Sequence, residues 1–145
     1  ASKSRPFTLK NTKATSFCFC GREFAVGTLD GKAFPVIEVL PLETRNKEEG
    51  MSLQGKTVQK CPAELPEELS EELIRTAEKV TQILGVTAYS KVDFILRSDG
   101  SFVCLECDSL PQLYQDAHLV LEAKAANVSF GELCDKIIEM SLRKN

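Results

Sequence analysis

The chain has 145 residues, of which 18 are basic and 21 acidic, so its formal net charge at pH 7 is -3. A chain of this length forms one domain around one hydrophobic core, and the lack of any block of basic residues excludes a nucleic-acid-binding patch. No stretch approaches the roughly 20 apolar residues that span a bilayer, and residues 1–13 hold no apolar run typical of a secretion signal. We therefore expect a soluble, cytoplasmic protein that binds neither nucleic acid nor membranes.

A β-hairpin is predicted in the first third of the chain. Residues 22–29 and 32–40 are rich in valine, isoleucine and phenylalanine, which is typical of strands. Asp30-Gly31 between them is a strong signal for a two-residue turn, because both residues tolerate a positive φ. The two strands should therefore pair side by side.

Two segments carry neither a strand nor a helix pattern. Residues 1–14 are polar and basic, so we expect a flexible lead-in, followed by a single domain over residues 15–145. Residues 41–60 are polar and contain two glycines, which predicts a long surface loop. Such loops often carry function.

Three helices are predicted in the rest of the chain. The first begins near Pro66, has apolar residues at steps of three or four, and ends at Gly85. The second covers residues 118–126. The third is capped by Ser129, with Glu132 completing a capping box. Its predicted apolar stripe continues through Ile137, Ile138 and Leu142.

Between the first two helices the sequence predicts a second β-hairpin, with strands at residues 87–97 and 101–107 and a two-residue turn at Asp99-Gly100. Strands and helices then follow in the order ββ, loop, α, ββ, α, α. This order predicts an α+β fold in which an antiparallel sheet has its helices packed on one face.

The turn also determines which residues of the second hairpin oppose each other. Counting outward from Asp99-Gly100, one face carries only apolar pairs: Leu96 with Val103, Phe94 with Leu105, and Val92 with Cys107. The opposite face places Asp93 against Glu106, with Asp108 two residues further along. Three carboxylates should therefore converge on one side of the hairpin.

Opposed carboxylates lie roughly 5 Å apart at Cβ and repel each other unless water, a base or a cation separates them. Magnesium is held by one or two carboxylates together with the phosphates of a nucleotide. Asp93, Glu106 and Asp108 suit such a site. A merely solvated acidic edge is the alternative that the spacing leaves open.

The six cysteines are expected to be reduced thiols, because the sequence carries no export signal. Cys104 and Cys107 differ by an odd number, so on a regular strand they would point to opposite faces. This spacing argues against a shared zinc site. We interpret the cysteines as small, buried apolar residues.

Several motifs resemble one enzyme family. They are Gly21-Arg22-Glu23-Phe24, Cys61-Pro62-Ala63, Lys91-Val92-Asp93-Phe94, Glu106-Cys107-Asp108-Ser109-Leu110-Pro111, and Ser129-Phe130 followed by Glu132-Leu133. Together they cover roughly residues 20–142. This stretch resembles the C-terminal part of the ATP-grasp domain of D-alanine:D-alanine ligases, which use ATP and magnesium to join two D-alanine molecules for peptidoglycan synthesis.

The resemblance implies a role for five residues. Asp93, Glu106 and Asp108 would be ligands of magnesium, with Asp108 in place of an asparagine of the family. Glu23 would contact the ribose of ATP. Lys91 stands where the family has a catalytic arginine, and a lysine keeps the charge but loses the planar, two-pronged contact with phosphate.

Other positions depart from the family. Gln112 replaces a glycine whose amide stabilises an oxyanion, and Met51-Ser52 stand where lysine-tyrosine is expected. His118, the only histidine, occupies an apolar position of the family. A general base is one interpretation, but we favour an ordinary surface or partly buried histidine.

The resemblance also implies missing partners. An ATP-grasp site is a cleft between two subdomains, and neither the first subdomain nor the N-terminal substrate domain is in these residues. We therefore expect that the chain alone does not make D-alanyl-D-alanine and needs those subdomains or a homodimer partner. Two functions stay open: part of a working ligase, or a non-catalytic module that binds metal, nucleotide or protein.

Overall fold

The structure is a computed structural model that describes residues 21–41 and 57–143. The predicted lead-in at residues 1–14, the predicted start of the domain at residue 15, and the Met51-Ser52 segment lie outside these residues.

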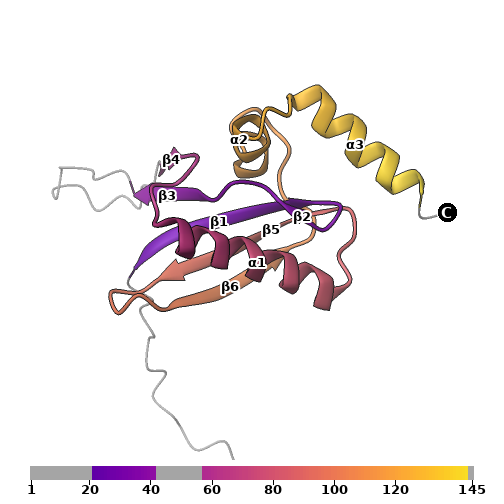
Figure 1. Ribbon diagram of the computed structural model, residues 1–145. Helices are drawn as coiled ribbons and strands as arrows, with labels where there is room; N and C mark the ends of the chain where they lie inside the picture. Colours follow the sequence, from indigo (N-terminus) through magenta and orange to yellow (C-terminus); the bar gives the residue numbers. More distant parts are fainter. Residues whose placement is uncertain (1–20, 42–56, 144–145) are drawn as a thin grey trace, which may run out of the picture.

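Within the described residues, six strands form one antiparallel sheet, and three helices pack around it (Figure 1). Along the sheet the order is β4-β3-β1-β5-β6, and β2 pairs with β1. The elements are β1 (Arg22–Leu29), β2 (Lys32–Ala33), β3 (Ile37–Pro41), β4 (Thr57–Lys60), α1 (Glu67–Leu84), β5 (Tyr89–Leu96), β6 (Phe102–Asp108), α2 (His118–Ala125) and α3 (Phe130–Leu142). The predicted α+β class and antiparallel sheet are confirmed. None of the described helices is long and apolar enough to cross a membrane.

The first hairpin has the predicted turn. Asp30 has a φ of 52° and Gly31 a φ of 70°, which is the backbone of a type I′ turn. The second predicted strand, however, is divided into β2 and β3, because Pro35 has no N–H to donate to a ladder. Between the two strands the N–H of Phe34 donates to the carbonyl of Gly27 at 2.8 Å.

Part of the predicted loop is a strand. Thr57–Lys60 forms β4, which pairs antiparallel with β3 and places Gln59 opposite Val39. The prediction of a continuous loop over residues 41–60 is therefore wrong at its C-terminal end. The segment is short and polar, so pairing with β3 rather than its own pattern makes it a strand.

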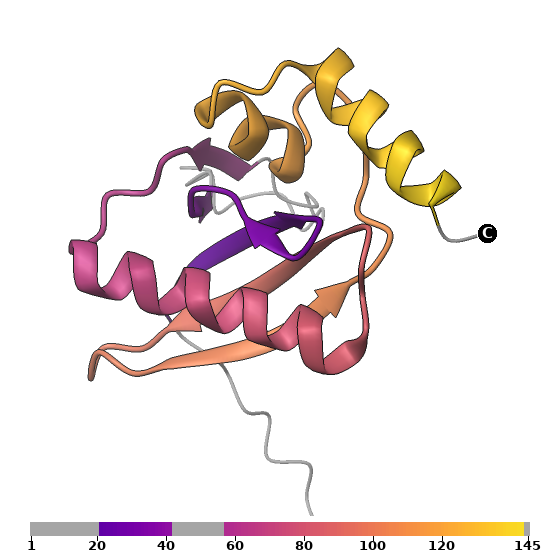
Figure 2. The same ribbon diagram turned by 45° about the vertical axis from the view of Figure 1, so that its right-hand side comes forward.

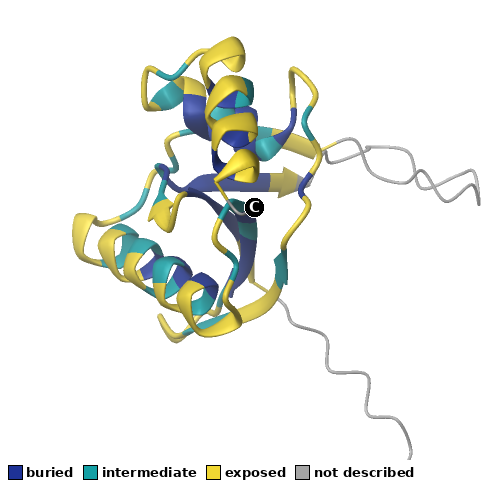
Figure 3. Cartoon of the chain, turned by 90° about the vertical axis from the view of Figure 1, so that its right-hand side faces the viewer, coloured by how far each residue is buried: buried dark blue, intermediate teal, exposed yellow. Residues whose placement is uncertain are grey.

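The helices cover both faces of the sheet (Figures 2 and 3). On one face α1 packs with Leu73 and Ala77 on alternate residues of β1 and β5, in a cluster that contains Phe24, Val26, Val92 and Phe94. On the other face α2 lies against Gly27, where a Cβ atom would collide with Leu119 and Glu122. In this detail the structure differs from the predicted packing on one face, because helical spacing shows which side of a helix is buried but not which face of a sheet it covers.

A second apolar cluster joins α2 and α3 to the end of β1. It contains Leu29, Phe34, Ala117, Leu119, Val120, Ala123, Leu133, Ile137 and Met140. The capping box of α3 is confirmed, since the N–H of Glu132 donates to Ser129 Oγ and the N–H of Ser129 donates to Glu132 Oε2. The predicted stripe is wrong in part: Met140 is buried, whereas Ile138 and Leu142 are exposed.

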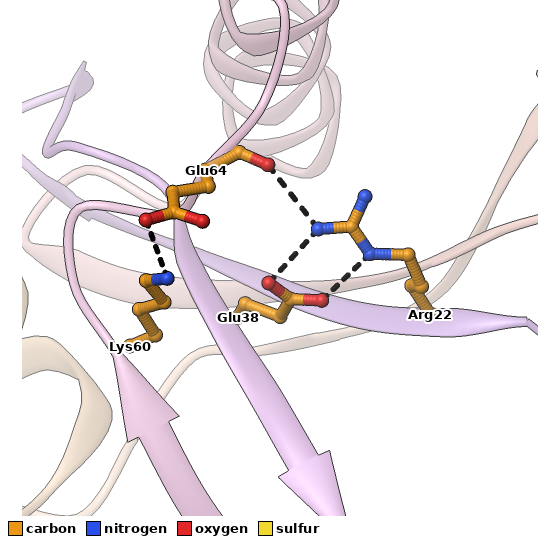
Figure 4. A network of polar contacts seen from close by, with 4 residues as sticks. All are labelled: Arg22, Glu38, Lys60 and Glu64. Carbon is orange, nitrogen blue, oxygen red and sulfur yellow. Dashed lines mark hydrogen bonds and ion pairs between the residues drawn. The ribbon is translucent and has the colours of Figure 1, made fainter.

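An ion-pair network fixes the edge of the sheet on the α1 face (Figure 4). Arg22 donates from Nε and Nη2 to the buried carboxylate of Glu38 at 2.7 and 2.9 Å, and from Nη2 to the carbonyl of Glu64 at 3.2 Å. Lys60 pairs with the Glu64 carboxylate at 2.6 Å. Because side chains alternate along a strand, Arg22 on this face leaves Glu23 on the opposite face.

Candidate functional site

The second hairpin differs from its predicted register close to the turn. The N–H of Arg97 donates to the carbonyl of Ser101 at 2.8 Å, so the loop has three residues and ends at Gly100, whose φ is 83°. This is the usual geometry of a three-residue hairpin loop with a left-handed last residue. As a result the pairs next to the turn are Leu96 with Phe102, Ile95 with Val103, and Phe94 with Cys104.

A β-bulge restores the predicted register at the acidic residues. The irregularity lies between Asp93 and Phe94 on β5 and leaves Leu105 on β6 without a partner of its own. Beyond the bulge Asp93 opposes Glu106, as the sequence predicted. The loop and the bulge each shift the register by one residue, and the two shifts cancel.

The shift changes which side chains reach the core. Phe102, rather than Val103, packs on the α1 face, where its ring meets that of Phe94 edge to face at 5.7 Å between centroids. Leu105 is 43% exposed. The prediction that Val103 and Leu105 join the core face is therefore wrong.

The bulge also overturns the predicted orientation of two cysteines. Cys104 pairs with Phe94 and Cys107 with Val92, and these partners share a face, so the two cysteines share a face as well. Both are free thiols, and burial raises the pKa of each above its ordinary value. Deprotonation, which metal binding or nucleophilic attack needs, is therefore disfavoured at both.

The five site residues singled out in the sequence lie on one face of three neighbouring strands, β1, β5 and β6. Directly opposed residues point to the same side of a sheet. The ladder opposes Glu23 to Ile95, Ala25 to Asp93, Gly27 to Lys91, Asp93 to Glu106, and Lys91 to Asp108. This is the face that α1 does not cover and that α2 covers mainly over β1 and β3, and we call it the open face.

Asp93 and Lys91 form an ion pair on the open face. Lys91 Nζ donates to Asp93 Oδ2 at 2.7 Å, and the two side chains are 20% and 10% exposed. The lysine thereby offsets the repulsion that the sequence predicted between Asp93 and Glu106. Glu106 itself is exposed, and Asp108 Oδ1 accepts the N–H of Leu110 at 2.9 Å.

The donor chemistry of the acidic trio fits magnesium, which prefers carboxylate oxygens. Its present arrangement does not complete a site: within residues 21–41 and 57–143, no three histidine, cysteine, aspartate or glutamate side chains are grouped so that they could hold a metal ion. Lys91 occupies one oxygen of Asp93. A cation bound between Asp93 and Glu106 would share the Asp93 carboxylate with Lys91 and would repel its ammonium.

A cavity of about 270 Å³ opens beside Lys91. It is lined by Lys91, Asp108, Pro111, Gln112, Tyr114, Ala117, His118 and Leu119. Burial lowers the pKa of His118 below its ordinary value of 6.5, Lys91 lowers it further, and Asp93 opposes them. His118 is therefore a partly buried, neutral imidazole near pH 7.

Sequence reasoning missed Glu122, the most unusual side chain of the open face. Glu122 is fully buried, and neither carboxylate oxygen forms a well-aligned hydrogen bond with the described residues. Burial raises its pKa well above 4.5; the neighbouring amide of Gly27 and the charge of Lys91 only partly offset this, and Asp93 adds to it. A signal was present, because Glu122 follows Leu119 by three residues and so shares the buried side of α2.

Glu122 also acts on the thiol of Cys61, which follows β4. Burial, and then the negative charge of Glu122, raise the pKa of Cys61 to about 12. Cys61 is therefore a protonated thiol at physiological pH. The interpretation of the cysteines as buried residues is wrong for those that the structure describes, because Cys61, Cys107 and Cys134 are partly exposed and Cys104 is exposed.

Known proteins share both the sequence and the fold. A family model described as "D-ala D-ala ligase C-terminus" matches residues 17–139. The D-alanine–D-alanine ligase of Methylacidiphilum infernorum is 35% identical over 121 residues, which are 83% of this chain and 40% of that protein. That of Citrifermentans bemidjiense is 36% identical over 124 residues, which are 86% of this chain and 41% of that protein.

A solved structure has the same arrangement. The crystal structure of the D-alanine–D-alanine ligase from Bacillus anthracis complexed with ATP superposes with a TM-score of 0.69 and 31% identity, over 86% of this chain and 39% of that one. The chain thus spans about 40% of the length of the relatives that it matches. Because the family model covers most of its residues and relatives more than 30% identical cover most of this chain, the chain belongs to the family of D-Ala–D-Ala ligase C-terminal domains.

Proposed function

We propose that this chain supplies the C-terminal half of an ATP-grasp active site that joins two D-alanine molecules, at the expense of ATP, for peptidoglycan precursors in the cytoplasm. The observation that carries the proposal is the open face, where Glu23, Lys91, Asp93, Glu106 and Asp108 come together from three strands. The opposing wall of the site comes from subdomains like those in the remaining 60% or so of its relatives, or from a second copy of the chain.

Each residue has a role that its position supports. Asp93 and Glu106, which oppose each other, would hold magnesium with Asp108 beside them. Magnesium, when bound, neutralises charge on the phosphates of ATP. Glu23 is exposed at the start of β1 and is free to accept a hydrogen bond from a ribose hydroxyl. Lys91 lies between the acids and the cavity beside α2, where its ammonium can donate to a phosphate or carboxylate oxygen.

A non-catalytic module is the second candidate. Two observations favour it: Lys91 is bound to Asp93 instead of standing free, and no three-ligand metal site is formed among the described residues. A chain with this function would bind a nucleotide or a protein partner on the open face without turnover.

A chimera separates the two candidates. The matching C-terminal part of the Methylacidiphilum infernorum ligase is replaced by this chain, and phosphate release that depends on ATP and D-alanine is measured. We expect release by the chimera and none by the isolated chain, because the latter lacks the opposing wall. Asp93→Asn and Glu106→Gln should each abolish release, and Lys91→Arg should increase it.

The result that contradicts catalysis is a folded chimera that stays inactive even with Lys91→Arg. Calorimetric titration of the isolated chain with magnesium and ATP then tests the binding module. Heat that disappears in Glu23→Gln and in Asp93→Asn supports binding on the open face, whereas unchanged binding in both variants places the ligand elsewhere.

A further inference from the structure

Lys91 lies between two carboxylates, only one of which it contacts. Its ammonium donates to Asp93 at 2.7 Å. The other carboxylate, that of Glu122, is fully buried and has no hydrogen-bond partner among the described residues. The charge of Lys91 is nevertheless close enough to act on Glu122.

The ladder places Glu122 within reach of Lys91. Gly27 opposes Lys91 directly, and Glu122 lies over Gly27, where its carboxyl carbon would be 3.4 Å from a Cβ atom at that position. Opposed Cβ positions in a sheet are roughly 5 Å apart. A lysine has a flexible four-carbon stem, so its ammonium can swing from Asp93, two residues along β5, to the carboxylate above Gly27.

The absence of a side chain at position 27 makes room for this carboxylate. A Cβ there would collide with Glu122 Oε2 and Leu119 Cδ1. The fold thus admits a carboxyl group to an apolar position between α2 and β1 and leaves it without a partner. An unpaired polar group in such a place is costly unless another state of the protein satisfies it.

We propose that Glu122 is a second acceptor for the ammonium of Lys91, so that Lys91 occupies Asp93 in one state and Glu122 in another. Neutralising Asp93, or binding a cation to it, releases the ammonium of Lys91. The ammonium then donates to the carboxylate of Glu122 instead. Glu122 is in this sense a positioning residue for Lys91. In a working ligase the displacing cation would be magnesium bound to a nucleotide, and this one point rests on the proposed function.

A double-mutant cycle tests the exchange without any nucleotide. The melting temperatures of the wild-type chain, Asp93→Asn, Glu122→Gln and the double variant are compared. If Lys91 moves to Glu122 when Asp93 is neutral, Asp93→Asn should lower the melting temperature in the Glu122→Gln background by about 2 °C or more beyond its effect in the wild type. Direct repulsion between Asp93 and Glu122 would give coupling of the same sign, so the cycle is repeated with Lys91→Met, where the coupling should disappear. Equal losses in both backgrounds overturn the proposal.

A control pair shows whether the coupling is specific. Glu139 lies with its side chain 66% exposed on α3, a helix that contributes no residue to the cavity beside Lys91, and Glu139→Gln makes the same change of charge there. Its effect should add to that of Asp93→Asn, as for independent sites. Coupling of equal size with Glu139 would mean that the cycle reports overall charge, and this also overturns the proposal.

A second measurement covers the case that Glu122→Gln does not fold. In the single variant Asp93→Asn, the carbon-13 signal of the Glu122 carboxyl group should move toward that of an ionised carboxylate at neutral pH, both because the charge of Asp93 is gone and because the arriving ammonium favours the charged form. Lys91→Met isolates the second cause: its effect on the signal should be larger in the Asp93→Asn background than in the wild type, and equal effects overturn the proposal. A signal identical to wild type rules out the exchange. Since neither measurement uses ATP, failure here leaves the chimera result standing, and the reverse also holds.

Discussion

On the face that α1 covers, the buried carboxylate of Glu38 is bound by two nitrogens of Arg22. On the face that α2 covers, the buried carboxylate of Glu122 is bound by no side chain that the structure describes and has only the amide of Gly27 as a neighbouring donor. The first arrangement holds β1 to β3 and to the segment before α1. The second arrangement lowers the stability of the fold, because the carboxylate is buried without a side chain that binds it. Such unsatisfied groups are expected where a protein gives up stability for function, and Glu122 lies beside Lys91 on the open face.

Breaking the satisfied pair should have the largest effect on stability. Arg22→Ala leaves Glu38 buried without its partner, which we expect to lower the free energy of unfolding by about 3 kcal/mol. Denaturant unfolding at pH 7 measures the loss. Arg22→Lys keeps the charge but not the two-pronged contact, so it should recover part of the loss. An Arg22→Ala variant as stable as wild type would show that the network contributes no stability.

Filling the space at Gly27 tests the contact between α2 and the sheet. In Gly27→Ala the new Cβ collides with Glu122 and Leu119, so we expect a loss of about 2 kcal/mol by overpacking. Gly131→Ala is the matched control, because nothing lies within 4 Å of its Cβ position in α3; it should be neutral or slightly stabilising. Equal stability of the two variants would contradict the position of α2.

The observed register of the second hairpin can be tested at its two large apolar side chains. Phe102→Ala removes a ring that packs on Phe94 and should cost about 1.5 kcal/mol, since the side chain is only partly buried. Leu105→Ala at the exposed bulge should cost less than about 0.5 kcal/mol. A regular two-residue turn would place Leu105 in the core. A larger loss of stability in Leu105→Ala would therefore support that register and contradict the observed one.

The smallest effect at neutral pH is expected from Glu122 itself. Its pKa is raised in the folded protein, first by burial, so the folded state holds this proton more tightly than the unfolded state. Stability from this group is therefore fully present below its ordinary pKa of 4.5 and is lost as pH rises through the folded value. The positive charge of Lys91 opposes the rise of this pKa and so limits the loss.

Melting temperatures from pH 5 to pH 8 measure this dependence. The wild type should fall further than Glu122→Gln, which cannot ionise and has nearly the same shape. Parallel curves for the two proteins would mean that Glu122 does not change its protonation in this range.

Local chemistry in the sequence was enough to predict several elements. Asp30 and Gly31 adopt the positive φ values of the predicted turn, Gly85 ends α1 with a φ of 68°, and Ser129 forms its capping box with Glu132. Each depends on residues at most a few positions apart, so the sequence contains the whole interaction. The opposition of Asp93 and Glu106 was also predicted, although two one-residue shifts had to cancel for the prediction to hold.

Only the tertiary structure decided the remainder. Thr57–Lys60 is a strand because β3 pairs with it, and α2 lies opposite α1 because Gly27 leaves room for it. The bulge at Leu105, the ion pair of Lys91 with Asp93 and the burial of Glu122 likewise depend on contacts between residues on different strands, or between strand and helix. The sequence gives the chemistry of these residues. It does not show which of them meet, because each contact joins segments that are distant along the chain and forms only when the chain folds.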